Sequence, residues 1–307
     1  MLLSDVNLSM SFQETLIEVN PKVRALISLL DDPEPDTFQH VSQQLVLLGN
    51  EVKEILEEEL YSAGNDLKTG HIESILSEIR INETGLKLKD WSKNGAKDLL
   101  DAFLILTEFK NPGIDTHDIR EEIANIQRQI WIELNDNMDP SEQIHTFNNL
   151  FFNVVGFHGN EQARKNPSTY FVNNVIYNKQ GNHLSLGIVY VILARMCGLP
   201  VSGVNLPGHF IAAYTNIPVN GISHGFDSLD ILYYINPLSR GTTFGRKELK
   251  LYLEKAGFAD EEQYYMPVGN RQIIYRLLDE ISQVYATESS LKNAEELRQL
   301  KNVLFAV

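Results

Sequence analysis

The chain begins with a series of amphipathic helical patterns. Apolar residues recur every three to four positions, as at Val23, Ile27 and Leu30, and this period predicts α-helices. The segments that show the pattern are 21–30, 37–49, 51–64, 95–109 and 116–135. We therefore predict a helical N-terminal region that ends near residue 136.

The pattern changes after that point. The segment LSLGIVYVILARMCG (184–198) is apolar on nearly every face, which predicts a buried helix. Segments 201–206, 209–215 and 231–236 are rich in Val, Ile, Tyr and Phe, which predicts strands. A buried helix followed by short strands predicts an α+β core in which the helix packs on a small antiparallel sheet.

Helical patterns return at 245–258, 271–286 and 291–304, and the last two predict a C-terminal helical hairpin of tetratricopeptide-like form. In the N-terminal region, a helix, an Asp-Pro turn and a second helix have the layout of one HEAT-like unit. We predict three regions: a HEAT-like helical region (1–136), the α+β core (137–268) and the C-terminal hairpin (269–307).

Charge and cysteine content narrow the function. The 307 residues carry a net charge of −15, which argues against nucleic acid or an anionic membrane surface as the partner. Cys197 is the only cysteine, so no intramolecular disulfide can form. The N-terminus has no basic segment of a signal peptide, and no apolar run spans a bilayer. We predict a cytoplasmic protein.

One motif stands at the start of the predicted buried helix. QGNHLSLG (180–187) places His183 where some enzymes hold a nucleophile. The core resembles the transglutaminase-like superfamily, which has a papain-like cysteine fold, and most closely its bacterial SirB-type branch. The motifs that carry the resemblance are Gly181-Asn182-His183-Leu184-Ser185-Leu186, Gly198-Leu199-Pro200, Leu206-Pro207-Gly208-His209-Phe210 and Asn236-Pro237 with Gly241.

The resemblance implies a site with three positions. In catalytic members a Cys begins the buried helix, a strand His acts as base, and an Asp or Asn orients that His. These positions fall on His183, His209 and Asn236, so His183 replaces the nucleophile. Ser185 points to the other face of the helix, and Cys197 lies at its opposite end. The sequence therefore lacks the usual thiol chemistry, and its site is vestigial or altered.

Structural roles compete with these site roles. Asn236 is also a polar residue that ends a strand before Pro237, which we favour over a catalytic role. For His183 we favour a structural role, as the first-turn residue of a helix capped by Asn182, over a reactive role. For His209 we give equal weight to a role in the site and a purely structural role in the strand. His224 is predicted to be a solvated turn residue.

We predict no cofactor and no metal. If a divalent metal were held, His183 and His209 would ligate it together with an Asn oxygen or a carboxylate from Asp227 or Asp230, but no metal-binding spacing supports this.

Two functions remain open. The favoured one is a non-catalytic binding or scaffold protein that recognises a protein or peptide. The alternative is an amide or peptide hydrolase, or an acyl transferase, that uses His209 as base and water or a metal-bound water as nucleophile. The oligomeric state does not follow from the sequence.

Overall fold

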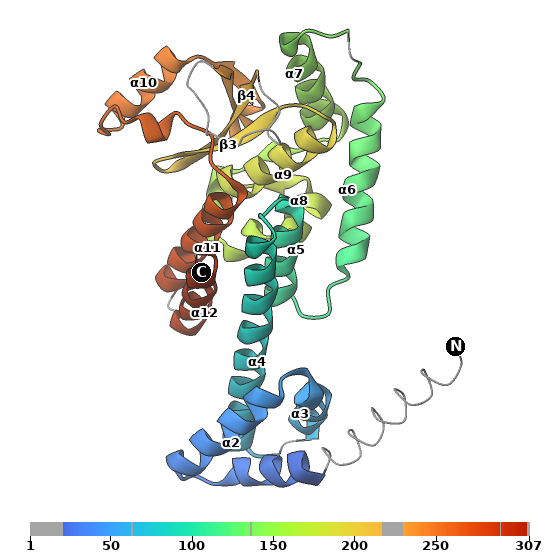
Figure 1. Ribbon diagram of the computed structural model, residues 1–307, viewed down its shortest axis with the longest axis vertical. Helices are drawn as coiled ribbons and strands as arrows, with labels where there is room; N and C mark the ends of the chain where they lie inside the picture. The colour runs from blue at the N-terminus through green and yellow to red at the C-terminus, as the bar shows by residue number, and fades with distance from the viewer. Residues whose placement is uncertain (1–20, 63, 136, 217–229, 289, 306–307) are drawn as a thin grey trace. The chain divides into compact units, whose positions relative to one another are not determined.

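The chain divides into two compact units, Met1–Leu86 and Lys87–Val307. The computed structural model (Figure 1) describes residues 21–62, 64–135, 137–216, 230–288 and 290–305. The region boundaries predicted after residues 136 and 268 both fall inside the second unit, and they stay predictions.

The first unit is built from helices around an apolar core. Residues 21–28 are helical, and Gly49, with a φ of +57°, ends the helix that follows them. The named helices are α2 (Pro35–Leu48), α3 (Asn50–Ser62) and the first part of α4 (Asp66–Lys93). The buried side chains of this unit, which include Val23, Leu30, Leu45, Leu56 and Ile75, form a single cluster.

The second unit is a helix-rich α+β structure. Its helices are α5 (Leu99–Lys110), α6 (Thr116–Trp131), α7 (Pro140–Asn149), α8 (Val172–Asn178), α9 (His183–Met196), α10 (Arg246–Lys255), α11 (Asn270–Thr287) and α12 (Leu291–Val303). Two short 3-10 turns, η3 (Glu161–Lys165) and η4 (Pro167–Tyr170), precede α8. Helices α11 and α12 lie side by side at the end of the chain (Figure 1).

The strands form two small sheets. An antiparallel sheet has the order β3-β4-β5-β6, and a parallel pair joins β1 to β2. The strands are β1 (His158–Gly159), β2 (Gln180–Gly181), β3 (Val201–Leu206), β4 (His209–Thr215), β5 (Ile231–Asn236) and β6 (Thr242–Phe244). The predicted α+β class is confirmed, and β3, β4 and β5 coincide with the predicted strands.

Helix α9 packs against β3 and β4 through a narrow slot. A Cβ atom added to Gly187 of α9 would lie 2.4 Å from Cδ1 of Phe210, and one added to Gly203 of β3 would lie 2.5 Å from its Cζ. The ring of Phe210 therefore fills the space that these two glycines leave open. This close packing holds the first turn of α9 near the first residue of β4.

The other face of the sheet is covered by α10. Leu249 and Leu253 of α10 are buried in one cluster with Ile211 and Ala213 of β4. Since side chains alternate along a strand, these odd-numbered residues point away from Phe210 and α9. At the start of the strand, the ring centroid of His209 lies 5.9 Å from that of Tyr252 in α10, so α10 contributes to its surroundings.

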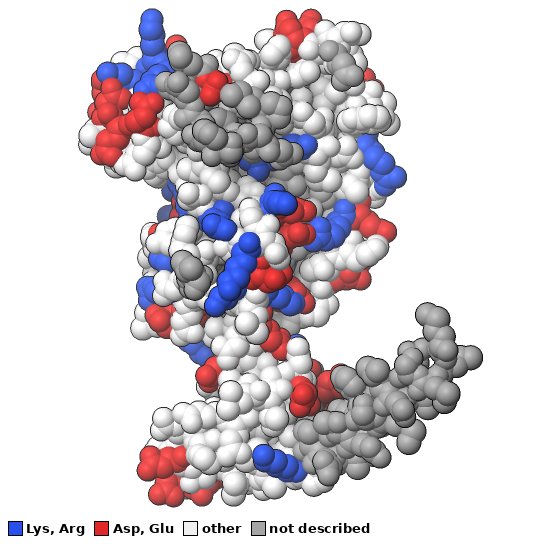
Figure 2. Space-filling view, viewed as in Figure 1, with Lys and Arg blue, Asp and Glu red and all other residues white. Residues whose placement is uncertain are grey.

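The charged surface is mixed in sign. On the face of the second unit shown in Figure 2, Lys and Arg side chains lie beside Asp and Glu side chains, with no continuous basic area. Among the described residues, no helix has both the length and the apolar character needed to cross a membrane.

Candidate functional site

Helix α9 begins at a buried polar turn. The side-chain oxygen of Asn182 accepts hydrogen bonds from the backbone N–H groups of Leu184 and Ser185, each at 2.9 Å. The hydroxyl oxygen of Ser185 accepts a hydrogen bond from the Asn182 N–H at 3.2 Å, which completes a capping box. Asn182 is thus the cap that the sequence predicts, and it fixes His183 as the first helical residue.

The side chain of His183 lies next to a carboxylate. Its imidazole is fully buried, and its Nε2 atom is 3.2 Å from Oε2 of Glu280 in α11. Neither ring nitrogen makes a hydrogen bond, so the carboxylate oxygen lies off the hydrogen-bond axis. The other carboxylate oxygen, Oε1, accepts a hydrogen bond from Nε of Arg276 at 2.9 Å.

The imidazole of His183 is neutral. Burial lowers its pKa to about 2, and the neighbouring charges of Arg164 and Arg276 and the ring of His209 act in the same direction. The contact with Glu280 is within ion-pair distance. It is nevertheless a contact with a neutral ring, because burial, the largest cause of the lowered pKa, disfavours the charged imidazole.

His209 lies beside His183. It follows the turn Pro207-Gly208, in which Gly208 adopts a φ of +69° that favours glycine, and it is the first residue of β4. The two imidazole rings have centroids 5.7 Å apart and an interplanar angle of 82°. The Nδ1 atom of His209 is buried without a hydrogen-bond partner, and burial lowers the pKa of this partly exposed residue.

Asn236 is engaged elsewhere. Its side-chain oxygen accepts a hydrogen bond from the Ser239 N–H at 3.3 Å, and its side-chain nitrogen donates to the Ser239 hydroxyl at 3.1 Å. It therefore begins the short turn after β5, the structural role that the sequence favoured. No hydrogen bond joins it to His209 within the described part of the chain. The structure brings His183 and His209 together but does not bond Asn236 to either.

The remaining nucleophile candidates are also occupied. Ser185 is buried, and its hydroxyl belongs to the capping box. Cys197 lies just past the C-terminal end of α9, where burial raises the pKa of its thiol to about 12. Both have the structural character that the sequence predicts.

Two residues of the site were not identified from the sequence. Arg276 and Glu280 lie on the same side of α11 as the buried Ile273 and Leu277, since 276 and 280 continue a helical repeat of three to four residues. These two residues could have been found in the sequence, because they are charged residues on the apolar face of an amphipathic helix. An unpaired charge on that face is costly, so such residues indicate a buried polar contact.

Of the two carboxylates that the sequence suggests as metal ligands, Asp227 lies outside the described residues, as does His224. Asp230 is described, and its backbone oxygen accepts a hydrogen bond from the Asn216 N–H. Among the described residues, one group of three potential ligands has its ligating atoms within 4.8 Å of one another. It consists of the exposed side chains of His117, Asp118 and Glu121.

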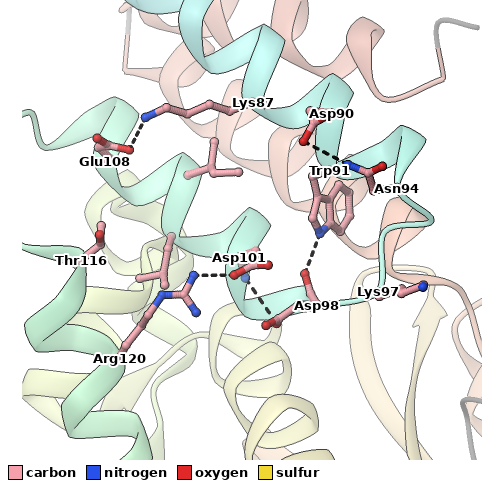
Figure 3. A pocket seen from close by; sticks show the side chains of 12 residues that line it. Lys87, Asp90, Trp91, Asn94, Lys97, Asp98, Asp101, Glu108, Thr116 and Arg120 are labelled. Carbon is pink, nitrogen blue, oxygen red and sulfur yellow. Dashed lines mark hydrogen bonds and ion pairs between the residues drawn. The ribbon is translucent and has the colours of Figure 1, made fainter. Parts of the chain in front are cut away.

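A separate hollow lies between α4, α5 and α6 (Figure 3) and has a volume of about 620 Å³. Four of its charged side chains form two ion pairs: Lys87 with Glu108 at 2.7 Å, and Arg120 with Asp101. Its indole, from Trp91, donates to a backbone oxygen. None of its lining residues belongs to the histidine site, so we assign it no function.

Comparison with known proteins identifies the class. Residues 117–279, more than half of the chain, match the family described as "Transglutaminase-like superfamily". The chain belongs to this superfamily, so the resemblance noted from the motifs is confirmed. No solved structure matches the chain.

The relatives are partial matches. A UPF0162 protein of Xylella fastidiosa strain Temecula1 is 28% identical over 148 residues, 45% of this chain and 47% of that protein. A UPF0162 protein of Vibrio cholerae is 25% identical over 116 residues, 38% of this chain and 43% of that protein. Human F-box only protein 21 is 20% identical over 167 residues, 54% of this chain and 26% of that protein. The matches thus span less than half the length of these relatives.

Proposed function

We propose that this chain is a non-catalytic binding or scaffold protein whose transglutaminase-like core recognises a protein or peptide. The observation that carries the proposal is the state of His183. A nucleophile must reach its substrate, whereas His183 is fully buried and contacts Glu280.

The surroundings of His209 favour the same conclusion. A base that acts in a triad is oriented by a hydrogen bond to its second ring nitrogen. The Nδ1 atom of His209 has no such partner, and Asn236 uses its amide for Ser239. The chemistry of the superfamily thus loses its nucleophile and its oriented base together.

The helical parts of the chain complete the proposal. We propose that the helices before the core are HEAT-like and that α11 and α12 act as a tetratricopeptide-like hairpin, two forms that commonly present surfaces to protein partners. The acidic net charge of −15 favours a protein or peptide over nucleic acid or an anionic membrane. A cytoplasmic location remains a prediction.

The alternative function is an amide or peptide hydrolase, or an acyl transferase, with His209 as base. One observation favours it: His209 is partly exposed, and its ring is uncharged at neutral pH because burial lowers its pKa. It lacks both an orienting partner and a neighbouring nucleophile, so we rank it second.

An experiment separates the two functions. The full chain is used to select ligands from a displayed peptide library, and a selected peptide is then titrated and incubated with the protein. We expect saturable binding, with the peptide recovered intact by mass spectrometry in the presence or absence of added Zn²⁺. Cleavage or acyl transfer that disappears in His209→Ala would overturn the proposal and establish the alternative.

A further inference from the structure

The histidine site contains buried polar atoms without partners. Both ring nitrogens of His183 and Nδ1 of His209 are buried and make no hydrogen bond. A buried polar atom left unpaired costs about 1–3 kcal/mol, so folded proteins rarely keep three of them together. Three such atoms on two neighbouring rings, which meet edge to face, indicate that a further group belongs at this place.

We propose that His183, His209 and Glu280 bind a divalent metal ion of the Zn²⁺ type, which joins α9, β4 and α11. The site goes beyond the binding role proposed above and does not depend on it. It also differs from the sequence-based possibility, since its carboxylate comes from α11 and not from Asp227 or Asp230.

The distances suit such an ion. Two ligands on a tetrahedral Zn²⁺ lie roughly 3.3 Å apart, given metal–ligand bonds of about 2.0–2.2 Å. Nε2 of His183 and Oε2 of Glu280 are 3.2 Å apart and share no hydrogen bond. Two imidazoles on the same ion have ring centroids roughly 5 Å apart. The centroids of His183 and His209 are 5.7 Å apart.

One adjustment completes the site. The ligating atoms of the three residues do not all lie within 4.8 Å of one another, since among the described residues only the exposed His117 group meets that distance. The proposal therefore requires the His209 side chain to adopt another rotamer when the ion binds. His209 is partly exposed at the start of β4.

The protonation states are also suitable. A metal needs neutral imidazoles, and the pKa values of both histidines are lowered by burial. Arg164 and Arg276 favour the neutral form of both rings, Glu161 acts in the opposite direction on His209, and the carboxylate of Glu280 supplies the negative charge at the ion. Arg276 holds Oε1 of Glu280, as outer residues orient the carboxylate ligands of metal sites, and leaves Oε2 toward His183.

Zn²⁺ titration of the full chain tests the site. The protein is first treated with chelator, and binding is then followed by calorimetry and, with Co²⁺ as a spectroscopic probe, by visible absorption. We expect one ion per chain with the intense bands of a tetrahedral site. We also expect Zn²⁺ to raise the unfolding temperature by mass action.

Variants locate the ion. His209→Ala and Glu280→Gln change partly exposed residues, and we expect each to weaken binding by at least about 100-fold; Arg276→Met should weaken it by about 10–100-fold with one ion still bound. His117→Ala, which disrupts the exposed ligand group on α6, is the matched control and should bind like the unchanged protein. Absence of binding, binding that Glu280→Gln leaves unchanged, or binding that His117→Ala abolishes would each overturn the proposal.

Discussion

Nε2 of His183 lies 3.2 Å from Oε2 of Glu280, so the residue that the motifs predict at the nucleophile position faces a carboxylate. The carboxylate belongs to α11, one residue beyond the part of the chain that matches the superfamily. A thiolate at position 183 would stand next to this like charge, which opposes its ionisation. We therefore expect that a cysteine placed at position 183 alone does not restore thiolate chemistry.

We predict that His183→Cys is nearly unreactive toward iodoacetamide in the folded protein. Burial and the carboxylate of Glu280 both raise the pKa of the new thiol, while the start of α9 lowers it only in part. Adding Glu280→Gln should speed labelling by about tenfold or more, since a nearby like charge shifts a pKa by about one unit or more. The rate of labelling, followed by mass spectrometry, measures the effect.

The control for that experiment is the protein's own cysteine. Cys197 is buried with a pKa raised to about 12, so it should label slowly, and Cys197→Ser removes it from the background. Rapid labelling of His183→Cys with Glu280 intact would show that the carboxylate does not control this position.

We predict that His183 makes the second unit less stable in acid. Its pKa falls from an ordinary 6.5 to about 2 on folding, so between these values the unfolded chain binds a proton that the folded chain does not. The unfolding free energy is therefore not reduced by His183 above pH 6.5. Below pH 6.5 it falls by about 1.4 kcal/mol per pH unit because of this group. The difference in unfolding free energy between the protein and His183→Asn should change by about 2 kcal/mol between pH 7 and pH 5.

Tryptophan fluorescence during urea unfolding measures this change, because both tryptophans, Trp91 and Trp131, lie in the second unit. His117→Asn, at an exposed position on α6, is the matched control and should show no such change. A pH dependence that is identical in the protein and in His183→Asn would mean that His183 is not held neutral.

The fold of the core could be predicted from local patterns. Strands β3, β4 and β5 have the predicted bounds because β-branched and aromatic residues fill them and turn residues bound them. Helix α9 was predicted from its apolar run and its Asn182 cap. Helix α4 was missed: its buried Ile72, Ile75 and Ile79 and its later Leu88 do not continue one 3.6-residue repeat, so the 28-residue helix has no single apolar face.

The site could be predicted only in part. His183 and His209 belong to short motifs, and the superfamily resemblance brings them together. Glu280 and Arg276 lie in a region predicted as a separate hairpin, and a contact between residues almost 100 positions apart leaves no local pattern. For Asn236 the motif was misleading. It suggests a residue that orients His209, whereas the Asn236 side chain accepts a hydrogen bond from the Ser239 N–H in the turn that follows.

We predict that the cap of α9 contributes measurably to stability. Asn182 is fully buried and accepts two backbone hydrogen bonds at 2.9 Å, so Asn182→Ala should lower the unfolding free energy by about 1–2 kcal/mol. Asn182→Asp preserves the acceptor oxygen and serves as the comparison, with a smaller loss expected. Urea unfolding followed by tryptophan fluorescence gives the values, and equal losses in the two variants would contradict the capping role.

The slot around Phe210 gives the last prediction. A methyl group on Gly187 would lie 2.4 Å from Cδ1 of Phe210, which is fully buried and has little room to move. Gly187→Ala should therefore lower the unfolding free energy by about 1–3 kcal/mol, although alanine is the better helix former. Gly70→Ala is the matched control, since Gly70 is also helical and has nothing within 4 Å of the added carbon; it should stabilise its helix by about 0.5–1 kcal/mol.

A second substitution tests whether the ring causes the loss. Phe210→Leu removes the atoms that approach Gly187, so the cost of Gly187→Ala should be smaller in the Phe210→Leu background than in the unchanged protein. Calorimetric unfolding of the four proteins gives this coupling. If the two losses simply add, the ring does not fill the slot, and α9 is held on the sheet by other contacts.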